Sequence, residues 1–230
     1  LALALLLALS INSSSHAIVV EPACPAADCA YLPLVYNPAP VRIVNAHPHS
    51  SRAGTFRLIG EVVATSDRPV YEVLIEVRVY DLFGQLLGTG TGPTLLAATL
   101  PCQVYPFEIG TNIATDDSYG HFEAAISHWS LESDRVYRPV TAVITGIEAI
   151  PLYGTTVYAE ARNDQPEPLA NVYGVIWSVH QSYPAIRRSL APCLAPGETV
   201  AFSEFLRDLG GTSVATIQVV AQGELTPCSP

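Results

Sequence analysis

VLIEVRVYDLFGQLLGTG (Val73–Gly90) carries the clearest structural signal in the chain. Its first half alternates, with an apolar residue at every second position. Because side chains of a β-strand point to opposite faces in turn, Val73, Ile75, Val77 and Val79 are predicted to share one face that is buried in a core. The pattern then breaks at Phe83-Gly84 and returns as a second apolar run. This stretch predicts a β-hairpin.

Comparable segments surround this hairpin and are separated by Pro, Gly, Asn and Asp. None has a convincing helical period over three turns. Short strands divided by turn residues at close spacing are typical of an all-β sandwich. The predicted strands are 55–64, 70–81, 85–92, 104–110, 121–132, 140–150, 154–162, 170–180, 198–206 and 213–225.

The second five strands repeat the first five. Placing one set on the other gives matches at an offset of 99 residues, and LPCQVYPF (100–107) matches APGETVAF (195–202) at an offset of 95. Order and spacing therefore predict two tandem β-sandwich domains, at 54–132 and 138–226, that are copies of one module. The matches at an offset of 99 are Glu61 with Glu160, Pro69 with Pro168, Val73 with Val172, and Val77 with Ile176.

The long strand of the second copy differs from its counterpart on one face. Val172, Gly174, Ile176 and Ser178 match the core face of the first copy. The opposite face is wholly apolar, and a contiguous exposed apolar patch usually marks an interaction site. This face is the predicted binding surface if it is open to solvent. The alternatives are that the other domain, the N-terminal tail, a partner protein or a glycan covers it. It consists of Tyr173, Val175, Trp177 and Val179.

The composition limits the partners. The 230 residues are 49% hydrophobic and carry a formal net charge of −10. Such a chain can bury substantial cores, and it repels phosphate backbones and anionic lipids. Nucleic acid is therefore excluded as the expected partner.

The N-terminal residues indicate export. An apolar run from Leu1 to Ile11 is too short for a transmembrane helix and precedes a polar stretch ending at Ser15-His16-Ala17. This is the pattern of a signal peptide over 1–17 with small residues before the cut, although an uncleaved anchor is the alternative. Residues 18–53 are rich in proline and predict a tail or linker. The mature chain is expected to be secreted or at the cell surface, with no transmembrane span.

An oxidising compartment permits disulfides, and the chain has five cysteines. Cys24 and Cys29 are close enough for a local loop, whereas Cys193 and Cys228 could attach the C-terminal tail to the second domain. Cys102 is then the odd cysteine. No metal or other cofactor is expected, because Cys24 and Cys29 lack a second ligand pair.

The sequence Val77-Arg78-Val79-Tyr80-Asp81, followed by LFGQLLGTG, resembles the bacterial FxLYD domain. The segment Leu100 to Phe107 matches the later LxPGqxxPF motif of that family, with Cys102 at its glycine. The resemblance covers residues 55–130, and the second copy keeps only LAPGETVAF (194–202). It implies an immunoglobulin-like sandwich in an exported bacterial protein with no established catalysis.

Other chemical motifs favour structural interpretations. GTGTG (88–92) has no following helix to bind a phosphate. His47 and His49 lack a third ligand, and the acidic loop with Asp116, Asp117 and Glu123 lacks the spacing of an EF-hand.

Hydrolytic chemistry has no clear motif either. His121 and His128 are seven positions apart on one predicted strand, so they are expected on opposite faces, and no Gly-x-Ser-x-Gly motif is present. We therefore expect a non-catalytic binding, adhesion or scaffold module at the bacterial cell surface. The alternatives are an accessory module that binds glycan or peptide for a partner enzyme, and a hydrolase with a cryptic triad.

Overall fold

The computed structural model describes residues 39–50, 55–114, 119–150, 154–178, 186–207 and 217–226, which form antiparallel strands. Within these ranges there is no helix, and therefore none long and apolar enough to cross a membrane. The strands are β1 (Val41–Ser50), β2 (Thr55–Ala64), β3 (Val70–Asp81), β4 (Leu86–Pro93), β5 (Ala98–Thr99), β6 (Val104–Ala114), β7 (Tyr119–Ser130), β8 (Tyr137–Ile150), β9 (Gly154–Arg162), β10 (Leu169–Ser178), β11 (Ile186–Leu194), β12 (Thr199–Arg207) and β13 (Ile217–Glu224). The predicted all-β class is confirmed.

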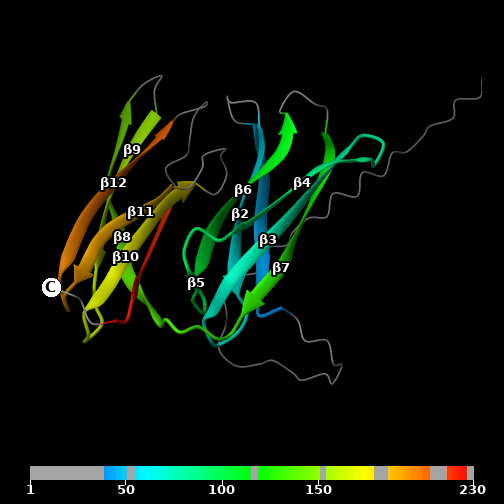
Figure 1. The fold of residues 1–230 in the computed structure, drawn as a ribbon. Helices are drawn as coiled ribbons and strands as arrows, with labels where there is room; N and C mark the ends of the chain where they lie inside the picture. Colours follow the sequence, from blue (N-terminus) through cyan, green and yellow to red (C-terminus); the bar gives the residue numbers. More distant parts are fainter. Residues whose placement is uncertain are drawn as a thin grey trace, which may run out of the picture.

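The first half of the chain contains two layers. One is the sheet β1-β2-β6, and in the other β3 pairs with β4, β5 and β7. The alternation of β3 is confirmed, because Val73, Ile75, Val77 and Val79 are all buried between the layers. Figure 1 shows these strands on one side of the molecule and β8 to β13 on the other.

The second half has the sheet order β11-β10-β13-β8-β9-β12. Strand β8 belongs to both layers. Its residues 137–140 pair with β13, whereas its residues 141–150 pair with β9, with a bulge between Ile144 and Gly146. The edge strands β11 and β12 are joined by a bidentate ion pair between Arg188 and Glu204, with a shortest N–O distance of 2.6 Å.

The two halves repeat one strand arrangement. Strands β1-β2-β6 of the first half correspond in order to β8-β9-β12, and β4-β3-β7 correspond to β11-β10-β13. Backbone conformation repeats as well. Glu72 and Asn171, which are 99 residues apart, both have positive φ, of 52° and 48°, and each lies at a register shift of its strand. Cys102 and Gly197, 95 residues apart, also both have positive φ, of 58° and 76°. Both offsets equal those of the sequence repeat.

The predicted hairpin is present, with its turn between β3 and β4. Gly84 has φ of 80°, a conformation that glycine adopts without steric cost. The side chain of Asp81 accepts hydrogen bonds from the backbone N–H groups of Phe83 and Gln85, both at 2.8 Å. This Asx-type arrangement fixes the turn. Phe83, at its tip, is 90% exposed.

Besides the two-residue β5, two longer strands were missed by the sequence patterns. Residues 41–50, assigned to the proline-rich tail, form β1, which pairs with β2. Residues 186–194 form β11, which pairs with β10. Each contains a proline, Pro48 or Pro192, and each lies at the edge of its sheet. Proline is tolerated at an edge because its missing N–H interrupts no internal ladder.

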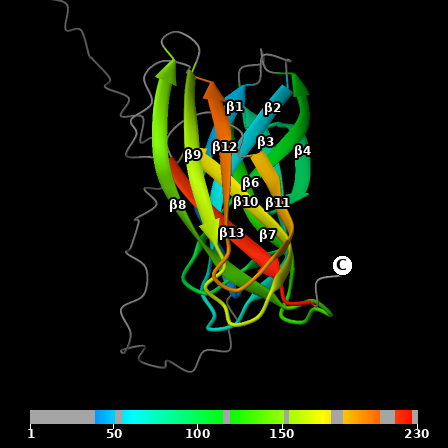
Figure 2. The same ribbon diagram turned by 90° about the vertical axis from the view of Figure 1, so that its left-hand side faces the viewer.

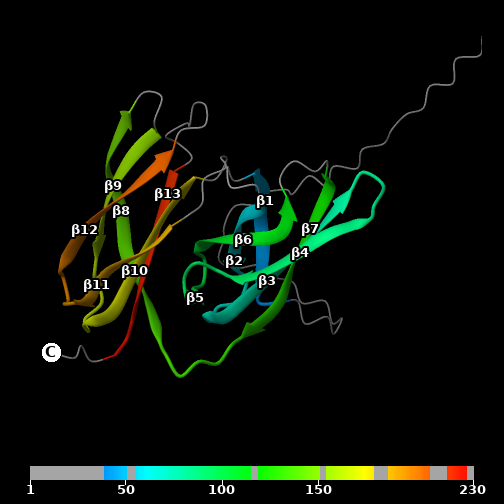
Figure 3. The same cartoon turned by 45° about the horizontal axis from the view of Figure 1, so that its top comes forward.

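The two halves lie side by side in the views of Figures 1 and 3, and side chains of β10 and β13 enter the hydrophobic core of the first half. Residues 131–136 connect β7 to β8 at one end of the molecule. The layer of the second half that faces the first half contains β10 and β13, whereas β9 and β12 lie on the far side (Figure 2).

Candidate functional site

The predicted apolar binding face on β10 lies at the junction of the two halves. Val175 is 0% and Trp177 is 2% exposed, and both belong to the hydrophobic core of the first half. These residues are therefore not open to solvent, because the first sandwich covers them. Tyr173 is half-buried at the margin, where the guanidinium of Arg187 lies 3.7 Å from its ring centroid. Val179 lies outside the described residues.

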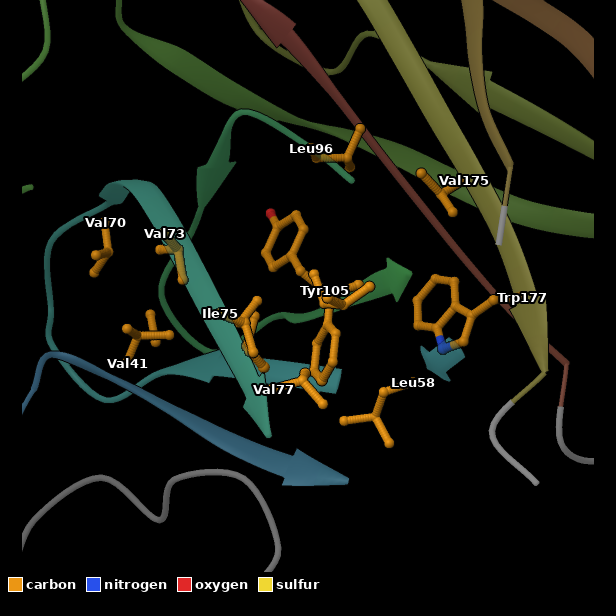
Figure 4. Close-up of a cluster of buried hydrophobic side chains, with 14 of the residues drawn as sticks. Val41, Leu58, Val70, Val73, Ile75, Val77, Leu96, Tyr105, Val175 and Trp177 are labelled. Atoms are coloured by element: carbon orange, nitrogen blue, oxygen red, sulfur yellow. The ribbon is translucent and has the colours of Figure 1, made fainter. Parts of the chain in front are cut away.

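Trp177 makes a specific polar contact across this junction. Its indole Nε1–H donates a 2.7 Å hydrogen bond to Oε1 of Glu61 on β2. Glu61 is itself buried, with 7% exposure. Figure 4 shows the indole in a cluster of buried side chains that includes Leu58 and Tyr105 of the first half. A buried tryptophan N–H and a buried carboxylate each need a partner, and here they satisfy each other.

A second polar contact crosses the junction from β13. The side-chain amide of Gln222, 1% exposed, meets the backbone of Ala98 on the short strand β5. Oε1 accepts from the Ala98 N–H at 3.3 Å, and Nε2 donates to the Ala98 carbonyl at 3.5 Å. The glutamine thus satisfies both backbone groups of one residue, as a neighbouring strand would do.

Strand β10 is consequently buried on both faces. Val172 and Ile176 point into the cores of the second half, as predicted, while Val175 and Trp177 point into the first half. A strand covered on both sides is expected to be apolar on both faces. This explains why the second copy has no polar face at this strand, whereas β3 exposes Arg78.

The outer face of the sheet formed by β8, β9 and β12 is a candidate site that the sequence patterns do not identify. Three apolar side chains are exposed on it, one on each strand: Val143 (50%), Tyr158 (42%) and Phe205 (40%). Figure 2 looks toward this side of the molecule. We call this surface the Tyr158 face, and its other members are Thr145, Glu148, Thr156, Glu160, Ala201 and Ser203.

The centre of the Tyr158 face is hollowed. Tyr158 is paired with Gly146 on β8 and with Ser203 on β12, so both neighbours in the sheet are small. A depression of about 510 Å³ is lined by these residues together with Thr145, Ala159, Ala201 and Phe202. The Tyr158 hydroxyl donates a 3.0 Å hydrogen bond to Oε2 of Glu148, which raises the pKa of the phenol. This hydrogen bond orients the ring, which lies beside Gly146 and leaves Tyr158 42% exposed.

The remaining chemical motifs have structural surroundings. The glycines of GTGTG lie on β4 against β6, where a Cβ on Gly90 would come within 2.3 Å of the Gly110 carbonyl oxygen. The predicted role of this segment as a plain strand agrees with that close approach. Asp116 and Asp117 lie outside the described residues, as do Cys24, Cys29 and Cys228. The proposed disulfides therefore stay predictions; Cys193 is on β11 and Cys102 is exposed.

The prediction that His121 and His128 face opposite ways is wrong. They pair with Tyr80 and Leu74, which share the outer face of β3. A bulge in β7 adds one residue between them, and this extra residue reverses the alternation. The ring of His121 stacks on Tyr80 at 4.7 Å, and Nε2 of His128 lies 3.6 Å from the Glu72 carboxylate. Across the described ranges, no group of three or more His, Cys, Asp or Glu residues is placed to hold a metal ion.

No family model matches the chain, and no curated protein matches it. Among solved structures, it is similar to red sea bream transglutaminase at 12% identity and a TM-score of 0.29, over 81% of this chain and 29% of that one. The chain thus corresponds to less than a third of that protein, and a likeness of this size carries no argument about fold or activity.

Proposed function

We propose that this chain is an exported, non-catalytic scaffold and binding module whose two immunoglobulin-like sandwiches act as one rigid unit. The hydrogen bond from Trp177 to Glu61 carries the proposal. It lies inside a hydrophobic cluster that includes Val175 and Val220 of the second half together with residues of β2, β3 and β6. An apolar core shared by two domains, with its polar groups paired, opposes independent motion of the domains.

The tandem immunoglobulin-like interpretation draws support from the repeated strand order and the repeated positive-φ positions. The FxLYD resemblance of the first half fits the same picture, since Cys102 takes the left-handed conformation that the glycine of that motif would adopt. Rigid pairing would hold the exposed surfaces of the two halves at a constant separation, which is what a scaffold requires.

Scanning calorimetry of residues 18–230 tests the rigid unit. A single transition, with equal calorimetric and van't Hoff enthalpies, is expected if the halves unfold together. Two separable transitions in the wild-type protein would contradict the proposal. The variant Trp177→Ala serves as the comparison, because loss of the shared core should separate the transitions.

Export rests on the signal-peptide pattern and is tested independently of the fold. Expression of the full-length precursor in a bacterial host should yield a protein outside the cytoplasm whose N-terminus is Ile18, as read by mass spectrometry. Retention of residues 1–17 would support the anchored alternative, and purely cytoplasmic protein would contradict export.

An accessory glycan- or peptide-binding role is the second candidate function. The sequence predicts this role for the apolar face of β10, which the first half of the chain covers. The exposed Tyr158 face on the opposite side of the second half is the observation that now favours such a role.

A further inference from the structure

We propose that the Tyr158 face binds a neutral carbohydrate chain, an inference that rests on the binding role proposed above. The face is one side of a sheet in which β9 pairs without interruption with β12 and, apart from the bulge between Ile144 and Gly146, with β8, so the strands fix the positions of its side chains. It lies on the side of β9 and β12 that faces away from the first half (Figure 2), and the junction with that half leaves it uncovered.

The ring of Tyr158 offers a stacking surface. Its cross-strand neighbours, Gly146 and Ser203, are too small to cover it, and the depression of about 510 Å³ lies beside it. The C–H face of a sugar ring is apolar and flat, and an exposed aromatic ring with an open side is the surface that it can stack on. The depression is open to solvent rather than enclosed, and its volume lies in the range of small-ligand sites.

The apolar surface extends beyond one ring. Glu160 pairs with Val143, and Thr156 pairs with Phe205, so these two apolar side chains lie on opposite diagonals from Tyr158. Diagonal neighbours in a sheet are about 7–8 Å apart. The three residues therefore form an oblique track across the sheet, which suits an extended chain better than a single sugar.

Polar groups flank this track. Thr145 and Ser203 line the depression, and two glutamates lie on the same face outside its lining, Glu148 opposite Thr156 and Glu160 opposite Val143. Carboxylates accept strong hydrogen bonds from sugar hydroxyls. Glu148 already orients the Tyr158 hydroxyl, so this part of the surface is organised before a ligand arrives.

The charges of the face select a neutral ligand. Its carboxylates repel phosphates, sulfates and uronic acids, and the whole chain has a net charge of −10. Arg162, farther along β9, is paired with Asp164 at 3.0 Å. A wholly apolar protein partner would have to desolvate Glu148 and Glu160 without replacing their hydrogen bonds.

The test titrates residues 18–230 with cellohexaose, xylohexaose, mannohexaose and N-acetylchitohexaose, followed by amide chemical shifts and calorimetry. We expect one or more of these to bind with shifts centred on β8, β9 and β12. Tyr158→Ala should weaken that binding at least about tenfold, because the stacking surface is lost. Tyr158→Phe keeps the ring and should retain most of the affinity. Phe83→Ala, which removes an exposed aromatic elsewhere, is the matched control and should bind as the wild type does.

The proposal is overturned if none of these oligosaccharides binds, or if Tyr158→Ala binds as tightly as the wild type. It is also overturned if sedimentation shows self-association that Tyr158→Ala abolishes, since a second copy would then occupy the face. Calorimetric unfolding of the same samples distinguishes failure of the carbohydrate proposal from failure of the scaffold proposal. If no oligosaccharide binds but the protein unfolds in a single transition, only the carbohydrate site is contradicted.

Discussion

Nε1 of Trp177 lies 2.7 Å from Oε1 of Glu61, which is 116 positions earlier in the chain. The two side chains come from different halves of the molecule, and both are buried. The apolar face of β10, which the sequence predicts as a binding surface if it is open to solvent, is therefore buried at the junction of the two halves. The proposed rigid union of the two halves depends on this contact between Trp177 and Glu61.

Replacing Trp177 by Phe should destabilise the protein by about 1–3 kcal/mol, because it leaves the buried Glu61 carboxylate without its donor. Urea unfolding measures the change. A double-mutant cycle with Glu61→Ala isolates the pair, and a coupling of about 1–3 kcal/mol is expected for groups in direct contact. Simple additivity of the two single changes would show that the contact does not form.

Gln222→Ala should cost about 1–3 kcal/mol, since it leaves both buried backbone groups of Ala98 unpaired. Gln218, four positions earlier on β13, is half-buried and provides the control. Its replacement by alanine should cost distinctly less. Equal losses for the two variants, measured by urea unfolding, would remove the argument that Gln222 joins β13 to β5.

The repeated turn at Cys102 and Gly197 predicts a backbone effect. Gly197 has φ of 76°, and a Cβ there would meet no atom within 4 Å. Gly197→Ala should therefore destabilise the protein by about 1 kcal/mol through conformation alone. Gly110→Ala is the control, because Gly110 has equal space but no positive φ. We expect it to leave the free energy of unfolding unchanged or slightly raised, and a loss equal to that of Gly197→Ala would contradict the account.

Stability should fall in alkali through Tyr105. Burial raises the pKa of this phenol, and the backbone at Leu100 lowers it to a smaller extent. Below pH of about 10 the phenol is neutral in both states, and its contribution to stability is complete. Above that pH the unfolded chain releases the proton and the folded chain retains it. The contribution is then lost by about 1.4 kcal/mol per pH unit until the folded pKa is reached.

Urea unfolding between pH 9 and pH 11 measures this dependence. Tyr105→Phe loses the 2.5 Å hydrogen bond to Gln103 at every pH, so its stability is offset from that of the wild type. Above pH of about 10, the free energy of unfolding of Tyr105→Phe should fall less steeply than that of the wild type, by about 1.4 kcal/mol per pH unit. Parallel curves for the two proteins would show that Tyr105 titrates normally in the folded state.

The alternation of apolar and polar residues predicted the strands that have one buried face and one face in contact with solvent. In β3 the buried Val73 and Ile75 alternate with Leu74 and Glu76, and the pattern identified both the strand and its core face. Strand β11 escaped detection because it is an edge strand in which Arg187, Arg188 and Pro192 obscure any apolar period. The bulge in β7 could not be predicted either, because one inserted residue does not change the composition of the strand recognisably.

The candidate sites show the same limit. The sequence shows that one face of β10 is apolar, but it does not show whether solvent or the other half lies against that face. That depends on contacts such as Trp177 with Glu61, which join distant parts of the chain. The outward orientation of Tyr158 can be predicted from the sequence, because the apolar Val157 and Ala159 on either side of it belong to the inward face of the strand. Its small neighbours on β8 and β12 required the register of the sheet.

The most direct test of the central claim is acrylamide quenching of Trp177 fluorescence in the Trp129→Phe variant. The chain has two tryptophans, so Trp177 is the one that remains in this variant. The account predicts that Trp177, 2% exposed, is shielded in the native monomer. It should become accessible only in the urea transition that also removes the β-sheet circular dichroism. Free quenching in native buffer, or exposure of Trp177 before that transition, would contradict the claim that the two halves form one unit.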